Sequence, residues 1–321
     1  MNAPNFCNKL SRLPCSWSTA QLITAMATPF SICGSSIDHQ QLHQLAQYLI
    51  HTQKSDALLV NGTTGESPTL SSEEKRLIIE TVLEAANSSA TPVLAGVGCN
   101  DTRRSIQEAE QVASMGVHGL LLVTPYYNRP IQRGLIEHFE AMAKAVSPMP
   151  VMLYNIPGRS AVELLPETVE TLVGRCANIV GVKQSVGNLD QCSEMVRLIT
   201  PYGGHLWSGD DSLTLPMMAV GAIGVVSVLS HLAGAPLKTM MQWMSQGNVG
   251  KAQTIHATYL QAMRDIFFLP NPTVIKAALA HKKLLHPSIR LPLVWPEDSE
   301  LERIEAMVRD LDALNQSSNN V

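Results

Sequence analysis

The sequence has few charges, few aromatic side chains and no cluster of basic residues. Of its 321 residues, 16% are charged and 5% are aromatic, and 23 basic against 27 acidic residues give a net charge of 23 − 27 = −4. The longest basic groups are pairs such as Arg103-Arg104. Proteins that bind nucleic acid gather Lys and Arg to contact phosphates. The composition therefore predicts no nucleic-acid partner.

Long apolar runs are also missing. A membrane helix needs about 20 consecutive apolar residues, and the longest candidate, residues 213–232, is interrupted by Gly221, Gly224 and His231. The six cysteines form neither a CxxC pair nor a Cys/His spacing typical of zinc. We expect a cytoplasmic protein with reduced thiols, no membrane segment and no metal.

Motifs for bound cofactors are weak. Gly96-Val97-Gly98 resembles the start of a dinucleotide motif, but Asp101 stands at the third glycine position. The patterns GxSxG, HExxH and the phosphate-binding GxxxxGK[ST] do not occur. The sequence favours chemistry that needs no cofactor.

Short apolar runs alternate with amphipathic stretches of helical period. The expected strands are 22–28, 57–61, 93–96, 119–123, 151–155, 179–183, 205–208 and 223–228. The expected helices between and after them are 39–51, 71–87, 102–115, 132–146, 166–173, 189–199, 211–220 and 236–246. Strands that are apolar throughout are typical of a parallel sheet covered by helices. Eight such units predict an α/β fold of the (β/α)8 TIM barrel type, with a doubly wound sheet as the alternative.

The chain beyond the eighth unit has a different pattern. Three helical stretches, 248–266, 273–284 and 298–315, follow without strands between them. We therefore expect a barrel over residues 21–246 and a C-terminal helical appendage over 247–321. Residues 1–20 are expected to form an N-terminal extension that is disordered or packed on the surface.

Polar residues at the carboxyl ends of the expected strands are candidates for the active site, because barrel enzymes bind substrates there. Lys183 ends the apolar run 179–182. Burial at that position would favour the neutral amine that forms an imine with a ketone. Tyr154 ends the neighbouring strand and could transfer protons to and from such an amine. The alternatives are an ion-paired surface lysine and an amphipathic tyrosine at the barrel rim.

The turn Gly62-Thr63-Thr64-Gly65 follows the second expected strand. Its two hydroxyls and its backbone N–H groups would suit a small carboxylate. The alternative is an ordinary turn before a helix that Ser71 and Glu74 begin as a capping box.

Five ordered motifs together resemble one enzyme family. They are Gly62-Thr63-Thr64-Gly65-Glu66-Ser67, Thr124-Pro125-Tyr126-Tyr127-Asn128-Arg129-Pro130, Tyr154-Asn155-Ile156-Pro157-Gly158-Arg159, Gly181-Val182-Lys183 and Ser208-Gly209-Asp210-Asp211. They are similar to the dihydrodipicolinate synthases, which belong with N-acetylneuraminate lyase to the pyruvate-dependent class I aldolases. The likeness extends from about Leu22 to beyond Pro292.

The resemblance implies that Lys183 forms an imine with pyruvate and that the derived enamine attacks L-aspartate 4-semialdehyde. The product would be 4-hydroxy-tetrahydrodipicolinate, in lysine and diaminopimelate biosynthesis. The resemblance also implies that the protein forms a homotetramer, which is a dimer of dimers. By motif position, Thr63, Tyr154 and Tyr127 would form the proton relay, and Tyr127 would reach into the neighbouring subunit's site. Thr64 would bind the carboxylate of pyruvate, and Arg159 would bind the carboxylate of the semialdehyde. Gly209 and Val226 would line the pocket.

Arg159 favours the synthases within this family. A guanidinium suits the second carboxylate of the semialdehyde, whereas the sialic acid lyases usually carry an apolar residue there. Two other hypotheses remain open. One is a related aldolase for a sugar-acid or sialic acid substrate, and the other is a non-catalytic barrel that binds a keto acid.

Two departures from the family pattern carry expectations. Gln184 follows Lys183 where many relatives have glutamate, which would remove a charge near the imine. The positions of the lysine-feedback site hold Ser72, Lys75 and Arg104 where relatives have two histidines and a glutamate, while Tyr126 and Asn100 match. Because Arg104 would repel the α-amino group of lysine, the resemblance predicts weak or absent lysine inhibition.

Overall fold

The structure is a computed structural model that describes residues 17–318. Its strands are β1 (Leu22–Ala25), β2 (Ala57–Val60), β3 (Val93–Val97), β4 (Gly119–Val123), β5 (Val151–Asn155), β6 (Ile179–Gln184), β7 (His205–Ser208) and β8 (Gly224–Ser227). They form a closed barrel in chain order, and the fold is the predicted (β/α)8 barrel. Every predicted strand is confirmed to within a few residues at its ends.

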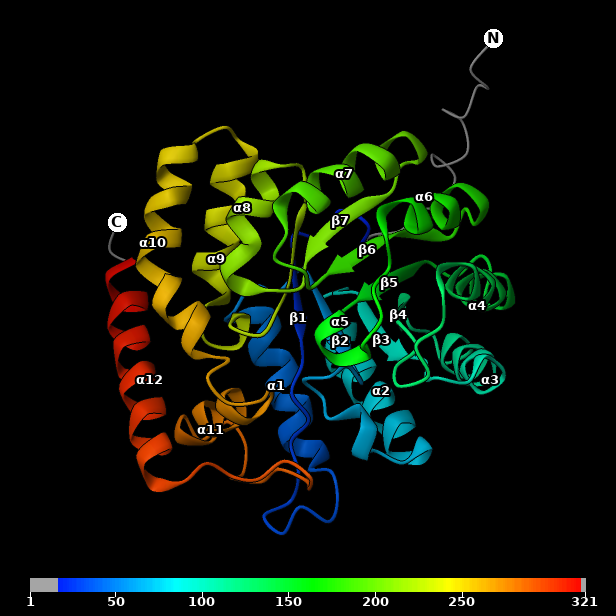
Figure 1. Cartoon of the computed structure of the whole chain (residues 1–321). Helices are drawn as coiled ribbons and strands as arrows, with labels where there is room; N and C mark the ends of the chain where they lie inside the picture. The colour runs from blue at the N-terminus through cyan, green and yellow to red at the C-terminus, as the bar shows by residue number, and fades with distance from the viewer. Residues whose placement is uncertain (1–16, 319–321) are drawn as a thin grey trace. The chain divides into compact units, whose positions relative to one another are not determined.

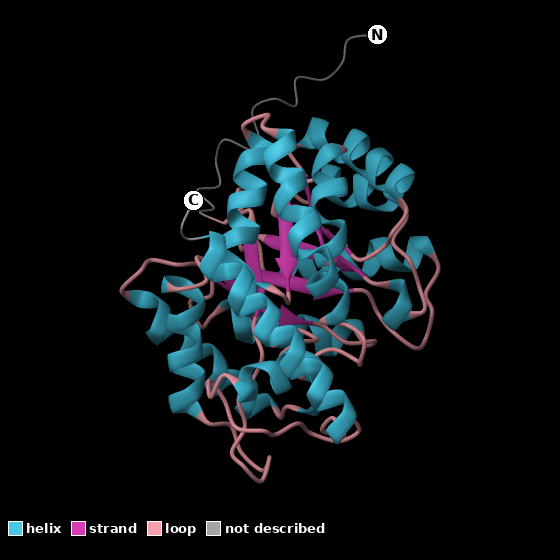
Figure 2. Cartoon of the chain, turned by 90° about the vertical axis from the view of Figure 1, so that its left-hand side faces the viewer, coloured by secondary structure: helices cyan, strands magenta, loops and turns pink. Residues whose placement is uncertain are grey.

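The helices follow the strands as the periodicity predicted (Figure 1). They are α1 (His39–His51), α2 (Ser72–Asn87), α3 (Thr102–Ala113), α4 (Gln132–Ala145), α5 (Pro157–Ser160), α6 (Pro166–Arg175), α7 (Leu189–Ile199), α8 (Thr214–Ala219), α9 (Ser230–Ser245), α10 (Val249–Asp265), α11 (Thr273–His281) and α12 (Asp298–Ser318). The predicted capping box at α2 is present, with Ser71 and Glu74 each accepting the other's backbone N–H. Because helices cover the strands (Figure 2), β2, β3, β5 and β6 are buried along their whole length.

Two helix predictions need correction. Helix α9 begins at Ser230 rather than at residue 236, because a first turn is joined to the main helix across a kink at Ala233. Pro236 cannot donate a backbone hydrogen bond to the preceding turn, which accounts for the break. The four-residue helix α5 was not predicted, because a single turn has no apolar period to detect.

The chain divides into two compact units. One contains Leu94–Val225 together with the described residues up to Ala20, and the other contains Gln21–Val93 and Val226–Val321. The predicted boundary at residue 246 lies inside the second unit. There α12 packs against α9, α10 and α11, and Figure 1 shows it beside α10 and α11.

Residues 17–20 are packed against the first unit. Trp17 is fully buried, donates its indole N–H to the carbonyl of His118 at 2.6 Å, and lies 6.1 Å from the ring of Trp207. Trp207 in turn donates to the carbonyl of Ala20 at 2.8 Å. The rest of the expected N-terminal extension, residues 1–16, lies outside the described residues.

His231 joins the ends of β1 and β8 inside the second unit. It is fully buried, its Nε2 accepts from the N–H of Ala27 at 3.1 Å, and its Nδ1 donates to the carbonyl of Val228 at 2.8 Å. Burial lowers the pKa of His231 from 6.5 to about 4, because protonation would add a charge that the interior cannot solvate.

We expect this histidine to make the fold sensitive to acid. Since its pKa falls on folding, its contribution to stability is complete above pH 6.5 and is lost as the pH falls toward 4. The complete loss corresponds to about 3 kcal/mol. Urea unfolding at pH 7 and pH 4.5 measures the loss, and His231→Gln should remove about that part of it. An unchanged pH dependence in the variant would contradict the expectation.

Candidate active site

Strands β5 and β6 place Tyr154 beside Lys183. Their register shifts by one residue after Val151, so that Tyr154 and not its neighbour lies opposite Lys183. Gly181 permits the shift with a φ of +152°, and a Cβ at this position would lie 2.0 Å from the carbonyl oxygen of His205. Paired residues of neighbouring strands point to the same side of a sheet. The bulge at Gly181 therefore aligns the two predicted catalytic side chains.

The amine and the phenol ring are in contact in a largely closed environment. The Nζ atom of Lys183 lies 4.2 Å from the centroid of the Tyr154 ring, and each residue is 6% exposed. The hydroxyl of Thr124 donates to the carbonyl of Tyr154 at 2.6 Å and fixes the end of β5. An amine held beside a phenol, with little water, suits imine formation assisted by proton transfer.

Gly209 approaches the same lysine from the end of β7. Its N–H donates to the carbonyl of Gln184 at 2.8 Å. A Cβ at Gly209 would lie 3.1 Å from Cε of Lys183 and 2.0 Å from Oγ of Ser185. A larger residue at this position would have to displace the side chain of Ser185 or Lys183, which gives glycine here a steric basis.

Arg159 lies on α5, just after β5, and is exposed. The loop that carries it is closed by Asn155, whose side-chain amide donates to the carbonyl of Leu164 at 3.1 Å and accepts from its N–H at 3.0 Å. Ser160 adds hydrogen bonds to the carbonyls of Ile156 and Val162. The Arg159 guanidinium is therefore exposed to solvent on a loop whose two ends are held together by hydrogen bonds.

Tyr127 points away from its own chain. Its side chain is 87% exposed, and its φ of 74° is uncommon for a non-glycine residue. The loop is held by Asn128, whose side chain donates to the carbonyl of Asn100 at 2.9 Å. A side chain that acts in the site of another subunit must be exposed in this way on its own chain.

The Thr63–Thr64 turn is tightly held within the second unit. The hydroxyl of Thr64 accepts from the side chain of Asn271 at 3.0 Å. The hydroxyl of Thr28 donates to the carbonyl of Gly65 at 2.8 Å, and a Cβ on Gly65 would lie 3.2 Å from that same hydroxyl. Thr64 is buried and Thr63 is half-buried. The turn is therefore a fixed element of the fold.

Val226 also belongs to the second unit, where it is 1% exposed in β8. The placement of Thr63, Thr64 and Val226 relative to Lys183 stays a prediction of the resemblance. Across residues 17–318, no three His, Cys, Asp or Glu side chains are grouped as metal ligands would be. None of the helices in that range is both long enough and apolar enough to cross a membrane.

Comparison with known proteins decides the family. The model of the dihydrodipicolinate synthetase family matches residues 18–311. The chain belongs to this family. A 4-hydroxy-tetrahydrodipicolinate synthase of Halalkalibacterium halodurans is 46% identical over 288 residues, which are 90% of this chain and 96% of the relative. One from a Cyanothece strain is 44% identical over 294 residues, covering 92% and 98% of the two chains.

A solved structure confirms the likeness in three dimensions. The dihydrodipicolinate synthase of Cyanidioschyzon merolae with lysine bound superimposes with a TM-score of 0.88 at 37% identity. The match covers 92% of this chain and 99% of that one. The predicted resemblance to the synthase family and the predicted barrel are both confirmed.

Gln184 does not face the reactive amine of this synthase-family chain. Successive residues of a strand point to opposite sides. The buried amide of Gln184 accepts from Asn155 at 2.9 Å and donates to Gln191, on α7, at 3.2 Å. We correct the expectation that a side chain at this position lies next to the imine. Gln184 instead belongs to a hydrogen-bond chain behind β5 and β6.

Sequence analysis missed two groups of the site. The hydroxyl of Ser185 is buried and finds no hydrogen-bond partner among the described residues, although it lies next to Gly209. Ser185 directly follows the end of β6 and lies two positions after Lys183. This spacing was a usable signal, because residues two apart in an extended chain point to the same side. Asn271 contacts Thr64 although the two residues are 207 positions apart in the chain. No local sequence pattern predicts such a contact.

Proposed function

We propose that the protein condenses pyruvate with L-aspartate 4-semialdehyde to form 4-hydroxy-tetrahydrodipicolinate through an imine on Lys183. Membership of the synthase family supports the reaction. The observation that carries the residue assignment is the buried contact between the Lys183 amine and the Tyr154 ring. The reaction serves lysine and diaminopimelate biosynthesis.

The proposed steps assign a role to each group. The neutral amine of Lys183 attacks the C2 carbonyl of pyruvate, and loss of water gives the imine. Loss of a proton from C3 gives the enamine, whose C3 attacks the aldehyde carbon of the second substrate. The amino group of that substrate then attacks C2 of the imine and expels the Lys183 amine, which closes the ring and frees the lysine. The phenol of Tyr154 transfers protons during these steps, with Thr63 and Tyr127 as the other members of the relay.

The two carboxylates of the substrates would have separate partners. The Thr63–Thr64 turn offers hydroxyl and backbone N–H donors to the carboxylate of pyruvate, with Thr64 in direct contact. The exposed guanidinium of Arg159 would hold the carboxylate of the semialdehyde. Gly209 and Val226 would line the pocket. Thr64, Arg159 and Gly209 follow barrel strands, and Val226 lies near the end of β8; substrates bind at the carboxyl ends of the strands in this fold.

Reductive trapping tests the assignment of Lys183. Borohydride with pyruvate should add a stable adduct to the wild-type chain, and digestion followed by mass spectrometry should place it on Lys183. Lys183→Ala should give no adduct. An adduct on another lysine would overturn the assignment, and no adduct in the wild type would favour a non-catalytic barrel.

Arg159 supports the semialdehyde over a sugar aldehyde. Sialic acid and sugar-acid aldolases bind a long polyol, whereas the proposed substrate carries a carboxylate that a guanidinium binds well. Turnover of L-aspartate 4-semialdehyde should exceed that of sugar aldehydes, and Arg159→Leu should raise its KM. Turnover of sugar aldehydes alone would support the related aldolase.

We propose that the protein acts in the cytoplasm as a homotetramer built from tight dimers. The exposed Tyr127 supports the dimer contact. If Tyr127 acts in the partner's site, Tyr127→Phe and Lys183→Ala chains regain activity when they are mixed and reassembled, since hybrid dimers then contain one complete site. Native mass spectrometry measures the assembly, and an active monomer would contradict it.

We also propose that lysine inhibits this enzyme weakly or not at all. Burial raises the pKa of Tyr126, Cys99 and Glu108 raise it further, and the Arg104 guanidinium opposes the rise, so the positive charge of Arg104 lies near Tyr126. This positive charge would repel the α-amino group of a bound lysine. Initial rates should be unchanged by millimolar lysine, and Arg104→Glu should increase the sensitivity. Strong inhibition of the wild type would overturn the proposal.

A further inference from the structure

A buried ion pair joins the Thr63–Thr64 turn to helix α11. The Nζ atom of Lys276 lies 2.6 Å from Oε1 of Glu66, and their side chains are 0% and 2% exposed. Lys276 also lies 4.1 Å above the ring centroid of Phe30. Glu66 is the residue that ends the turn. A buried ion pair is weak evidence for stability, because removing two charges from water offsets much of their attraction. Its presence therefore calls for another explanation.

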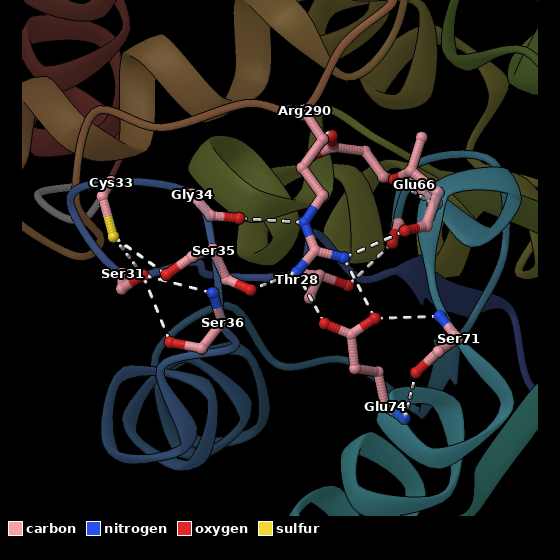
Figure 3. Close-up of polar contacts among 12 residues, drawn as sticks. Thr28, Ser31, Cys33, Gly34, Ser35, Ser36, Glu66, Ser71, Glu74 and Arg290 are labelled. Atoms are coloured by element: carbon pink, nitrogen blue, oxygen red, sulfur yellow. Dashed lines mark hydrogen bonds and ion pairs between the residues drawn. The ribbon is translucent and has the colours of Figure 1, made fainter.

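Both oxygens of Glu66 are engaged. Oε1 accepts from Lys276, and Oε2 accepts from the backbone N–H of Arg290 at 3.0 Å. The Arg290 guanidinium lies 4.2 Å above the ring of Phe30 and binds both oxygens of Glu74, at 2.6 and 3.0 Å. Figure 3 shows Arg290 between Glu66 and Glu74, with further hydrogen bonds to the 31–36 loop. Segments that are more than 200 residues apart in the chain meet at this carboxylate.

The backbone of the turn depends on this anchoring. Glu66 has a φ of 57°, a left-handed conformation that costs free energy in a non-glycine residue. Its N–H donates to the carbonyl of Thr63 at 3.1 Å, so the position of Glu66 is coupled directly to Thr63. Thr64 is held from the same C-terminal region by Asn271. The surrounding contacts thus impose a backbone shape that this sequence would not prefer alone.

The charge on Lys276 depends on its partner. Burial lowers the pKa of Lys276 to about 8, and the carboxylate of Glu66 opposes the fall. Loss of either side chain would leave the other as a buried group without its counter-charge, which is strongly destabilising. Loss of both charges together leaves no such group.

We infer that Glu66 and Lys276 are positioning residues that set the Thr63–Thr64 turn for the carboxylate of pyruvate. The inference rests on the proposed role of that turn in substrate binding. Both side chains are buried and paired with each other, so neither is assigned a contact with substrate. The ion pair fixes the backbone on which Thr63 and Thr64 are carried, and misplacement of a binding group by a fraction of an ångström weakens binding strongly.

Three variants separate positioning from simple stabilisation. Glu66→Gln and Lys276→Met should each lower the melting temperature. The double variant should melt closer to the wild type, because it contains no unpaired buried charge. Its KM for pyruvate should nevertheless stay raised by about tenfold or more, with a much smaller change in kcat at saturating pyruvate. Recovery of both melting temperature and KM in the double variant would overturn the inference.

A second, partly exposed ion pair provides a control. Lys238 pairs with Asp56, which precedes β2, whereas the turn follows β2. Lys238→Met should destabilise the protein without raising the KM for pyruvate. Borohydride trapping with saturating pyruvate distinguishes failure of the proposed function from failure of the positioning role. Absence of an adduct in the wild type would reject the proposed function, whereas a wild-type adduct together with a KM unchanged in the double variant would reject the positioning role alone.

Discussion

Replacing Gly181 with alanine is expected to abolish activity and to destabilise the protein by more than about 4 kcal/mol. A Cβ at this position would lie 2.0 Å from the carbonyl oxygen of His205, and the φ of +152° is one that side chains rarely adopt. The clash is with backbone, so no side-chain rotation relieves it. Relief requires β6 to move against β7, which would also displace Lys183 from Tyr154.

Thermal unfolding and borohydride trapping measure the two parts of this effect. Gly187→Ala is the matched control, because a Cβ there meets only Cδ1 of Leu213, at an ordinary 3.8 Å. The control should melt and form the imine as the wild type does. A Gly181→Ala protein with normal melting and normal trapping would show that the register shift is not required.

Removing the hydroxyl of Tyr154 is expected to lower kcat by about 10²- to 10⁴-fold, the usual contribution of a positioned general acid or base. Tyr154→Phe keeps the ring that packs against Lys183, so the fold and the surroundings of the amine should be retained. Trapping of pyruvate should still occur, but more slowly, because carbinolamine dehydration loses its proton donor.

Steady-state rates and single-turnover trapping test this expectation. Tyr259→Phe is a suitable control, since it removes a buried hydroxyl that bonds to Asn315 in the C-terminal helices. That variant should lose some stability and keep its kcat. A decrease of less than about tenfold in Tyr154→Phe would assign the main proton transfer to another group.

The strands were predictable because each is buried on both sides. Every residue of an apolar run such as Val93–Val97 is buried, so the same preference for apolar side chains holds along its whole length. The start of α2 was predictable for a different reason, since Ser71 and Glu74 form their contacts within four residues. Local patterns thus identified the elements and the strand ends that carry Lys183 and Tyr154.

Features set by distant contacts were not predictable in this way. The uniform run 179–182 gave no sign that the β5–β6 register shifts at Gly181, because the shift depends on the neighbouring backbone at His205. Strand alternation turns the side chain of Gln184 away from Lys183, so adjacency in the sequence does not place it beside the amine. Asn271 and Lys276 reach the Thr63–Thr64 turn through tertiary folding alone.

The attachment of this turn to Asn271, Lys276 and Arg290 has a consequence for synthesis on the ribosome. A nascent chain that has emerged as far as residue 270 already contains all eight strands and every residue predicted to touch substrate. It still lacks the three residues that hold the turn from the C-terminal side. Compact units generally fold as wholes during synthesis, and the unit that contains Gln21–Val93 also contains residues from Val226 onward. We therefore expect the turn to be fixed only after its C-terminal partners have been made. Synthesis of residues 271–290 would therefore set when the proposed binding turn is complete.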